Sequence, residues 1–261
     1  MEDMNLTFVR CESLTSFTSA LPAGLKGLNS TWRLCDLTGS WTLAIPSGVT
    51  DISSAWFGNP NLTSFTATLP TGIDSVKSCW GNCSLTSWTL AIPPAVTDLE
   101  DAWINNDISV WNTALPTSAT NLKSAWRDNP LTTWTAAIPN TVATLDNAWR
   151  GCNLTSWPHD LPENLQSATQ TWRGNNLATW TGNIPAASRC TDWTNAFVTN
   201  KLDQASVDKI LIDIAASDAV ANPYDNTKRL NLNGGTNATP SAAGLAAKAT
   251  LVGAGWIVTH N

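Results

Sequence analysis

Apolar and polar positions follow one another along this chain in a pattern that returns every 23 or 24 residues. A proline marks each return, at intervals of 24, 24 and then five times 23 residues: Pro22, Pro46, Pro70, Pro93, Pro116, Pro139, Pro162 and Pro185. A fixed period of roughly 20–50 residues indicates stacked copies of one supersecondary unit. The pattern therefore predicts a repeat solenoid, mainly β, with eight to nine coils of about 23 residues.

Two columns of aromatic residues share this period. We call the residues five positions before each proline the strand aromatics: Phe17, Trp41, Phe65, Trp88, Trp111, Trp134, Trp157 and Trp180. We call the tryptophans ten positions after the first seven prolines the ladder aromatics: Trp32, Trp56, Trp80, Trp103, Trp126, Trp149 and Trp172. A copy that contacts only its neighbours needs such residues for packing, so we expect both columns in the core, with indole N–H groups bonded to carbonyl oxygens. A track of exposed rings that stack sugars is the alternative.

Each period divides into a strand and an arc. In residues 85–107, one face of the expected strand is apolar: Trp88, Leu90 and Ile92. This period of two predicts one buried strand face, and Pro93 ends the strand because proline cannot donate to a ladder. Apolar residues then follow at steps of three and four, which fits a short helical or 3₁₀ turn or an irregular arc: Val96, Leu99 and Trp103.

A further column lies three residues after the ladder position. Each position of this column holds either cysteine or asparagine: Cys11, Cys35, Asn59, Cys83, Asn106, Asn129, Cys152, Asn175 and Asn200. A buried asparagine can donate to carbonyls of one coil and accept from another, and a thiol can do a weaker version of the same. We therefore expect this Asn/Cys column to be structural.

The six cysteines allow two interpretations. Their places in the repeat favour free, small, buried groups, including Cys79 and Cys190 outside the column. At least one disulfide bridge remains the alternative. Their spacing does not match that of zinc ligands.

The repeat LTSWTLAIPPAVTDLEDAWINN resembles the BspA-like leucine-rich repeats of bacterial surface proteins. The shared features are an Ile-Pro or Leu-Pro pair, Val96, Leu99, the Ala102-Trp103 pair and the Asn/Cys column, over roughly residues 5–200. This chain departs from the family in carrying Trp where Phe is usual, and in one residue inserted before the Ile-Pro pair, which leaves the width of the arcs open. The resemblance implies a right-handed solenoid used in binding and adhesion, without a catalytic site.

The repeat fades after Pro185, and residues 201–261 form a different pattern. We expect the solenoid to span residues 1–200 and an αβαβ capping module to span 201–261. Its helices are expected at 203–217, with Asp203 as N-cap, and from Pro240, as the first helical residue, to Gly253 or Gly255; its strands are expected at 230–232 and 256–259. The stretch GGTNATPSAAGLAAKATLVGAGWIVTHN is similar to tails of repeat proteins of phages and their bacterial hosts, which implies a virion setting.

The net charge is −6 and only 13% of residues are charged. An acidic chain without a basic cluster is not expected to bind nucleic acid, and no apolar run is long enough to insert into a membrane. The segment Met1-Glu-Asp-Met shows no signal peptide. Because the repeat starts close to Met1, we expect an end that is either cut from a longer chain or covered by a second copy in a homo-oligomer.

The sequence contains no constellation of catalytic residues, cofactor motif or metal-ligand set, so we expect a protein that is not an enzyme. Neither His159 nor His260 is expected beside a nucleophile. Three acidic residues fall on one arc: Asp98, Glu100 and Asp101. They fit a solvated acidic surface, with a calcium site as the alternative.

The outward face of the strands carries small hydroxyl and methyl groups in register, such as Ser40, Thr42 and Ala44, until Pro158 and Asp160 interrupt the pattern. We call it the strand face. A solvated strand surface explains it, because threonine suits strands. Ice binding, docking of a partner and oligomerisation are the alternatives.

Arginines directly follow four ladder aromatics: Arg33, Arg127, Arg150 and Arg173. Stacked arginines repel one another unless an anion, an acidic partner or an aromatic ring relieves the charge, so this arginine stripe is a candidate recognition feature. We therefore expect a non-enzymatic binding or adhesion solenoid of a phage virion or a bacterial cell surface. Its partner would be a host-surface receptor, glycan or protein, or a virion protein. A purely structural spacer is the competing hypothesis. A glycan-degrading repeat protein is a further alternative, but the sequence offers no paired catalytic carboxylates at unique positions.

Overall fold

The structure is a computed structural model and describes residues 2–217, 219 and 227–261. The chain forms two compact units, Met1–Ala136 and Ala137–Asn261, which we describe separately as unit 1 and unit 2. Both consist of stacked coils, which confirms the predicted repeat fold. The expected division into residues 1–200 and 201–261 stays a prediction. The expectation about the N-terminal end starts from Met1, which lies outside the described residues.

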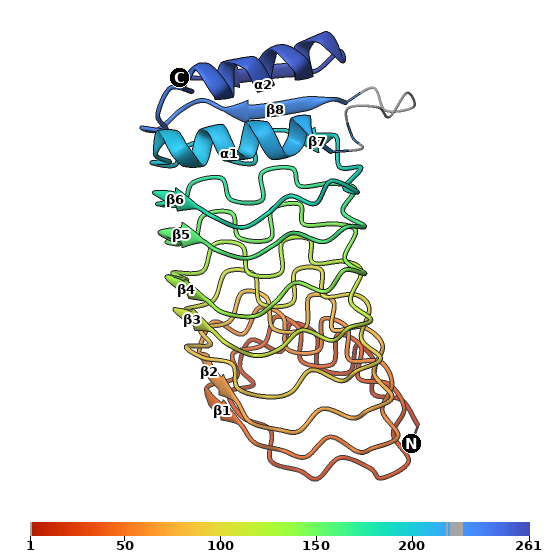
Figure 1. The fold of residues 1–261 in the computed structure, drawn as a ribbon. Helices are drawn as coiled ribbons and strands as arrows, with labels where there is room; N and C mark the ends of the chain where they lie inside the picture. Colours follow the sequence, from red (N-terminus) through yellow and green to blue (C-terminus); the bar gives the residue numbers. More distant parts are fainter. Residues whose placement is uncertain (1, 218, 220–226) are drawn as a thin grey trace. The chain divides into compact units, whose positions relative to one another are not determined.

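Unit 1 carries short strands at one side of its coils (Figure 1). They are β1 (Gly39–Trp41), β2 (Leu62–Phe65), β3 (Val110–Trp111) and β4 (Thr133–Trp134). β1 pairs in parallel with β2, and β3 pairs in parallel with β4, so that Trp41 lies opposite Phe65 and Trp111 opposite Trp134. The chain around Trp88 has no assigned strand, although Trp88 is buried and its neighbours Ser87 and Thr89 are exposed, as the alternation predicts.

The arcs are series of turns, which decides among the three forms that the sequence allows. In the arc that precedes Cys35, Thr31 N donates to Leu28 O, and Ser30 has a positive φ of 55°. The N–H of Ser30 then donates to Ser53 O in the next coil at 2.8 Å. The same left-handed conformation recurs at one position of each following arc in this unit: Ser54, Ser78, Asp101 and Ser124. A helix would keep its N–H groups within one coil, whereas these turns direct alternate N–H groups to the neighbouring coil.

All fifteen tryptophans are buried, as expected for core residues. Ladder aromatics of neighbouring coils stack with nearly parallel rings, with centroids 5.6 Å apart for Trp32 and Trp56 and 6.2 Å for Trp56 and Trp80. The strand aromatics meet them edge to face, as Trp41 does with Trp56 at 5.1 Å. Offset-stacked and T-shaped pairs are the arrangements that aromatic quadrupoles favour. The core of each unit is therefore built largely from ring contacts between coils.

The expected hydrogen bonds of the indole N–H groups form only in part. Several strand aromatics donate to the carbonyl two residues ahead, as Trp88 does to Leu90 O at 3.0 Å and Trp111 to Thr113 O at 2.9 Å. The prediction is wrong for other rings, whose buried N–H groups have no hydrogen-bond partner: Trp32, Trp56, Trp80, Trp103, Trp157, Trp172 and Trp180. The ladder rings lie between other rings, while the arc carbonyls already accept from backbone N–H groups of neighbouring coils.

Unit 2 starts with the same architecture and ends with two helices. Its elements are β5 (Ser156–Trp157), β6 (Thr179–Trp180), β7 (Asp192–Trp193), α1 (Gln204–Ala215), β8 (Arg229–Leu232), α2 (Ala242–Gly253) and β9 (Ile257–His260). β5 pairs in parallel with β6, and β7, β8 and β9 form one parallel sheet. The helices α1 and α2 lie side by side (Figure 1). The predicted αβαβ order is confirmed.

The helix ends follow their capping residues. The Asp203 side chain accepts from Ser206 N and caps α1, as predicted, and the apolar stripe of α1 is buried. Pro240 is not the first residue of α2, because Ser241 accepts from Ala243 N and is the N-cap. The carboxylate of Asp208 in α1 also accepts from Ser241 N at 2.9 Å. This bond ties the start of α2 to α1 and places a negative charge at the N-terminus of α2.

Candidate functional site

The Asn/Cys column joins neighbouring coils from inside. The Asn59 amide donates to Trp32 O at 2.9 Å and to Trp56 O at 2.8 Å, and its Oδ1 accepts from Leu37 N at 3.0 Å. Comparable sets of bonds are made by four further members: Asn106 and Asn129 in unit 1, Asn175 and Asn200 in unit 2. All five side chains are buried. They satisfy backbone groups at a corner of the coil and are not available to a ligand.

Cysteines replace asparagine in this column with a single thiol donor. Cys35 Sγ lies 2.9 Å from Phe8 O, and Cys83 Sγ lies 3.2 Å from Trp56 O. Burial raises the pKa of Cys83 to about 12, so its sulfur keeps the proton that it donates. All six cysteines are free, which agrees with the favoured interpretation. Cys11 is exposed, however, which corrects the expectation that all six cysteines are buried. It lies in the first described coil, and a described coil packs against that coil on one side only.

The sequence patterns do not predict two positions that join neighbouring coils. Asn237 is a further member of the Asn/Cys column, because its amide donates to Phe197 O at 3.0 Å and its Oδ1 accepts from Leu202 N at 2.9 Å. The residue before the ladder aromatic also links coils when it is polar. Thr31, Cys79 and Thr171 each donate to a carbonyl of the coil before, in the bonds to Met4, Ile52 and Leu145. The polar side chains of these interior positions thus serve to join neighbouring coils.

The strand face lies on the outside of the coils, as predicted. Its threonines have unequal roles at one repeat position. Thr66 and Thr135 donate to the carbonyls of Trp41 and Trp111, while Thr89 makes no hydrogen bond to the described protein. Asn112 occupies the same position in a further coil. Ice binding needs a regular lattice of like groups, and these differences interrupt it within unit 1.

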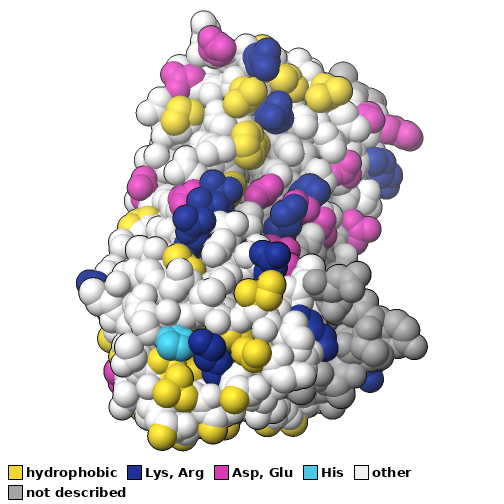
Figure 2. Space-filling model, turned by 90° about the horizontal axis from the view of Figure 1, so that it is seen from above, with side chains coloured by type: hydrophobic (Ala, Val, Ile, Leu, Met, Phe, Trp, Pro, Cys, Tyr) yellow, Lys and Arg dark blue, Asp and Glu magenta, His cyan; other side chains and the backbone are white. Residues whose placement is uncertain are grey.

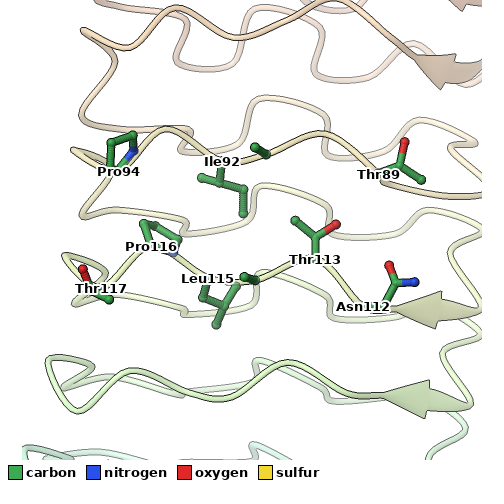
Figure 3. Close-up of a pocket in the computed structure, with 10 residues that line it drawn as sticks. Thr89, Ile92, Pro94, Asn112, Thr113, Leu115, Pro116 and Thr117 are labelled. Carbon is green, nitrogen blue, oxygen red and sulfur yellow. The ribbon is translucent and has the colours of Figure 1, made fainter.

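A groove crosses the strand face of unit 1 where the strands end (Figure 3). It has a volume of about 680 Å³ and runs between two neighbouring coils. Its lining consists of small apolar and hydroxyl-bearing residues: Thr89, Ala91, Ile92, Pro94, Asn112, Thr113, Ala114, Leu115, Pro116 and Thr117. No charged side chain contributes. The groove can therefore accept apolar or uncharged polar groups of a partner.

A second groove, of about 380 Å³, lies between two earlier coils of unit 1. It is lined by Ala20, Leu21, Ala23, Leu43, Ala44, Ile45, Pro46 and Ser47. Each of these residues stands at the same distance from its repeat proline as a residue of the first groove. Ala20 corresponds to Ala91, and Ile45 corresponds to Leu115. The repeat thus produces the same surface feature more than once.

The arginine stripe does not form one uniform feature. Arg33 lies over the Phe57 ring at 5.2 Å, and Arg127 forms an ion pair with Asp128 at 2.9 Å. Arg150 and Arg173 contact only amide oxygens, those of Asn147 at 3.5 Å and Gln170 at 3.1 Å. All four side chains are partly exposed.

The acidic arc of unit 1 is neutralised from both sides. Glu100 forms ion pairs with Lys77 at 2.8 Å and with Lys123 at 3.0 Å. Burial acts to raise the pKa of Glu100, but hydrogen bonds and charge from both lysines outweigh it and lower the pKa overall. Burial, followed by the charge of Glu100, raises the pKa of Asp101. The carboxylate of Glu100 is already engaged, which disfavours a calcium site on this arc.

The two histidines of the chain make different contacts. The His159 ring meets Trp157 edge to face at 5.4 Å, and His260 Nδ1 lies 2.6 Å from Asn261 O. Among the described residues, no group of three or more His, Cys, Asp or Glu side chains could hold a metal ion.

Uncharged atoms make up most of the surface in the view of Figure 2, with basic and acidic side chains scattered among them. This appearance agrees with the low content of charged residues, 13%. In the part of the chain that the structure describes, no helix has the length and apolar character needed to cross a membrane.

No protein-family model matches this chain, and no curated protein matches it either. Among solved structures, it is similar to a leucine-rich repeat protein from Bacteroides ovatus, with a TM-score of 0.43 and 14% sequence identity. The match covers 82% of this chain and 54% of that protein, so this chain spans about half of its length. The resemblance to BspA-like repeats therefore remains a resemblance, while the coils and parallel pairings of this chain establish its repeat fold.

Proposed function

We propose that this protein is a non-catalytic binding solenoid that docks a partner on the strand face of unit 1. The observation that carries the proposal is the recurrence of one groove at equivalent repeat positions in two pairs of coils. Repeat proteins use such periodic, extended surfaces to contact a partner along several coils. The lining favours a partner surface with apolar and uncharged polar groups, because the groove offers no charge to pair with.

The strand face can carry such a role because the interior does not depend on it. Thr89, Ala91 and Ala114 are exposed, while Trp88 and Ile92 of the same coil are buried. Substitutions on the exposed side leave the ring contacts and the Asn/Cys column untouched. The setting that we propose is a phage virion or a bacterial cell surface, supported by the resemblance to surface repeats and by the similarity of the C-terminal stretch to phage-associated tails. The partner would then be a host-surface receptor or a virion protein.

The test compares the protein with two variants on a glycan array and in a displayed peptide library. The groove variant Ala91→Arg/Ala114→Arg places two long charged side chains in the first groove. The control variant Thr120→Arg places one on an exposed position of an arc in the same unit. We expect ligands that bind the protein and the control but not the groove variant. Ligands that bind all three proteins would place the site elsewhere, and no ligand at all would favour the structural spacer.

A further inference from the structure

Arg150 and Arg173 start from adjacent coils of unit 2, at the same position of the repeat. The rings of the preceding residues, Trp149 and Trp172, stack at 5.9 Å with an interplanar angle of 11°. The coils are joined beside the arginines by a bond of 2.9 Å from Gly151 N to Arg173 O. Two cationic side chains are therefore held side by side on one surface, at a spacing set by the stacking of the coils.

These two arginines lack the charge compensation that the other members of the stripe have. Neither forms an ion pair with a described residue, and their partners are the neutral amides of Asn147 and Gln170. Arg127 has the carboxylate of Asp128, and Arg33 has the Phe57 ring. Like charges so close together repel one another, and an anionic ligand would remove that cost.

The residues that follow Arg150 and Arg173 have no side chains. Gly151 and Gly174 follow the two arginines, and both are exposed. Their φ values of 70° and 73° do not by themselves require glycine, because Leu34 adopts 58° at the equivalent position of unit 1. A Cβ at Gly174 would meet only the main chain of Gly151, at 3.9 Å. Neither glycine adds a side chain beside the two arginines, so the main chain there stays open to a planar group.

We propose that Arg150 and Arg173 form a site for carboxylates of an acidic polypeptide segment. Guanidinium groups bind carboxylates through paired, charge-assisted hydrogen bonds. Alternate side chains of an extended peptide are about 6.6 Å apart, which is close to the 5.9 Å between the stacked rings. An extended segment with acidic residues at alternate positions can therefore offer one carboxylate to each arginine. A glycan is the less suited ligand, because Trp149 and Trp172 are buried and cannot stack a sugar.

This site is independent of the strand-face grooves of unit 1, so the two proposals fail separately. The experiment measures the fluorescence anisotropy of a labelled hexaglutamate peptide with the full chain. The test variant is Arg150→Gln/Arg173→Gln. The matched control is Arg33→Gln/Arg127→Gln, which removes the same number of positive charges from the other two positions of the stripe.

We expect the full chain to bind the peptide, and the test variant to bind at least about tenfold more weakly, because it loses two charge-assisted contacts. The control should keep its affinity, and added salt should weaken binding by the full chain. No binding by the full chain, or an equal loss in both variants, would overturn the proposal. Tighter binding of an oligogalacturonate of equal charge would also overturn it, in favour of an acidic glycan.

The fold of each variant is checked by its tryptophan emission and its melting temperature. If the glutamine variant does not fold, the variant Arg150→Lys/Arg173→Lys tests the proposal instead. It keeps both positive charges but loses the planar guanidinium groups. A loss of about threefold or more would support the site, since lysine cannot replace bidentate arginine contacts. Unchanged affinity would contradict it.

Discussion

The side-chain amide of Asn106 donates a hydrogen bond of 2.8 Å to the main-chain oxygen of Trp80 in the neighbouring coil. It also donates to Ile104 O, and its Oδ1 accepts from Leu85 N at 2.9 Å. One buried side chain thus connects three backbone groups of two coils. Removing it leaves these groups without water or another partner, so the cost is greater than that of an ordinary surface hydrogen bond.

Asn106→Ala is expected to lower the free energy of unfolding by about 3 kcal/mol, because buried unsatisfied groups cost roughly 1–3 kcal/mol each. Denaturation in urea measures the change. Asn112→Ala is the matched control, since Asn112 is exposed and does not have a positive φ that alanine would strain. That control should stay within about 0.5 kcal/mol of the unchanged protein. Equal effects of the two substitutions would contradict a structural Asn/Cys column.

Asn106→Cys is expected to fall between these two variants. Cys83 occupies the preceding place in the column with one thiol bond to Trp56 O, so a thiol can replace part of the amide. A cysteine variant as unstable as the alanine variant would show that the thiol bond contributes nothing at this position.

The thiols should differ sharply in reactivity. Burial raises the pKa of Cys83 to about 12 and also raises that of Cys79, and both side chains are inaccessible. Because the thiolate is the reactive form, neither should react at neutral pH in the native protein. Exposed Cys11 should react with a maleimide, and all six thiols should react after unfolding. Mass spectrometry counts the labels. Rapid labelling of Cys79 or Cys83 in the native protein would contradict the burial of this part of the coil.

The ion pairs of Glu100 should make stability depend on pH and salt. Its pKa is lowered in the folded protein, so its contribution is present above the unfolded pKa and is lost as pH falls through the folded value. The lysines are partly exposed, so we expect Glu100→Gln to cost only about 0.5–1 kcal/mol at neutral pH and low salt. Unfolding curves at pH 7 and pH 3 measure this. A difference between the two proteins that stays the same at pH 3 would show that charge is not its origin.

The ring stack should tolerate phenylalanine better than a small residue. Trp80 is fully buried and stacks on Trp103 at 5.5 Å. Phe197 takes the ladder position in unit 2, where it stacks on Trp172 at 5.4 Å. We expect Trp80→Ala to cost about 3–5 kcal/mol and Trp80→Phe markedly less, as measured by urea denaturation. Similar costs for both variants would mean that ring stacking is not what stabilises the coil.

The sequence predicts most of the fold because each coil repeats the same requirements. The period of the prolines, the two aromatic columns and the Asn/Cys column all correspond to features of the coils. The sequence does not decide the conformation of the arcs, because steps of three and four suit both helices and turns. Their conformation depends on positive φ at residues such as Ser30 and Asp101, and serine and aspartate do not signal that conformation as glycine would.

The last part of unit 2 shows the limit of this reasoning. Asn237 joins the Asn/Cys column although it comes 37 residues after Asn200, because α1 enlarges the coil between them. No proline or aromatic residue marks its register. Its only signal is its place five residues after Leu232, the last residue of β8. A column defined by a period of 23 residues misses such a member.

The candidate site was harder to predict than the fold. The sequence places four arginines in one stripe but does not show that Asp128 and Phe57 compensate two of them. It also predicts the exposed strand face but not its grooves, each of which is lined by residues of two neighbouring coils. Both features arise from contacts between coils, which a pattern within one repeat does not contain.

Collisional quenching of tryptophan fluorescence by iodide tests the account most directly. All fifteen indole rings are buried, and the stacking of coils depends on them. The account predicts blue-shifted emission that iodide hardly quenches until the protein is unfolded. Emission near that of free tryptophan, quenched by iodide in the native protein, would contradict a core built from these rings.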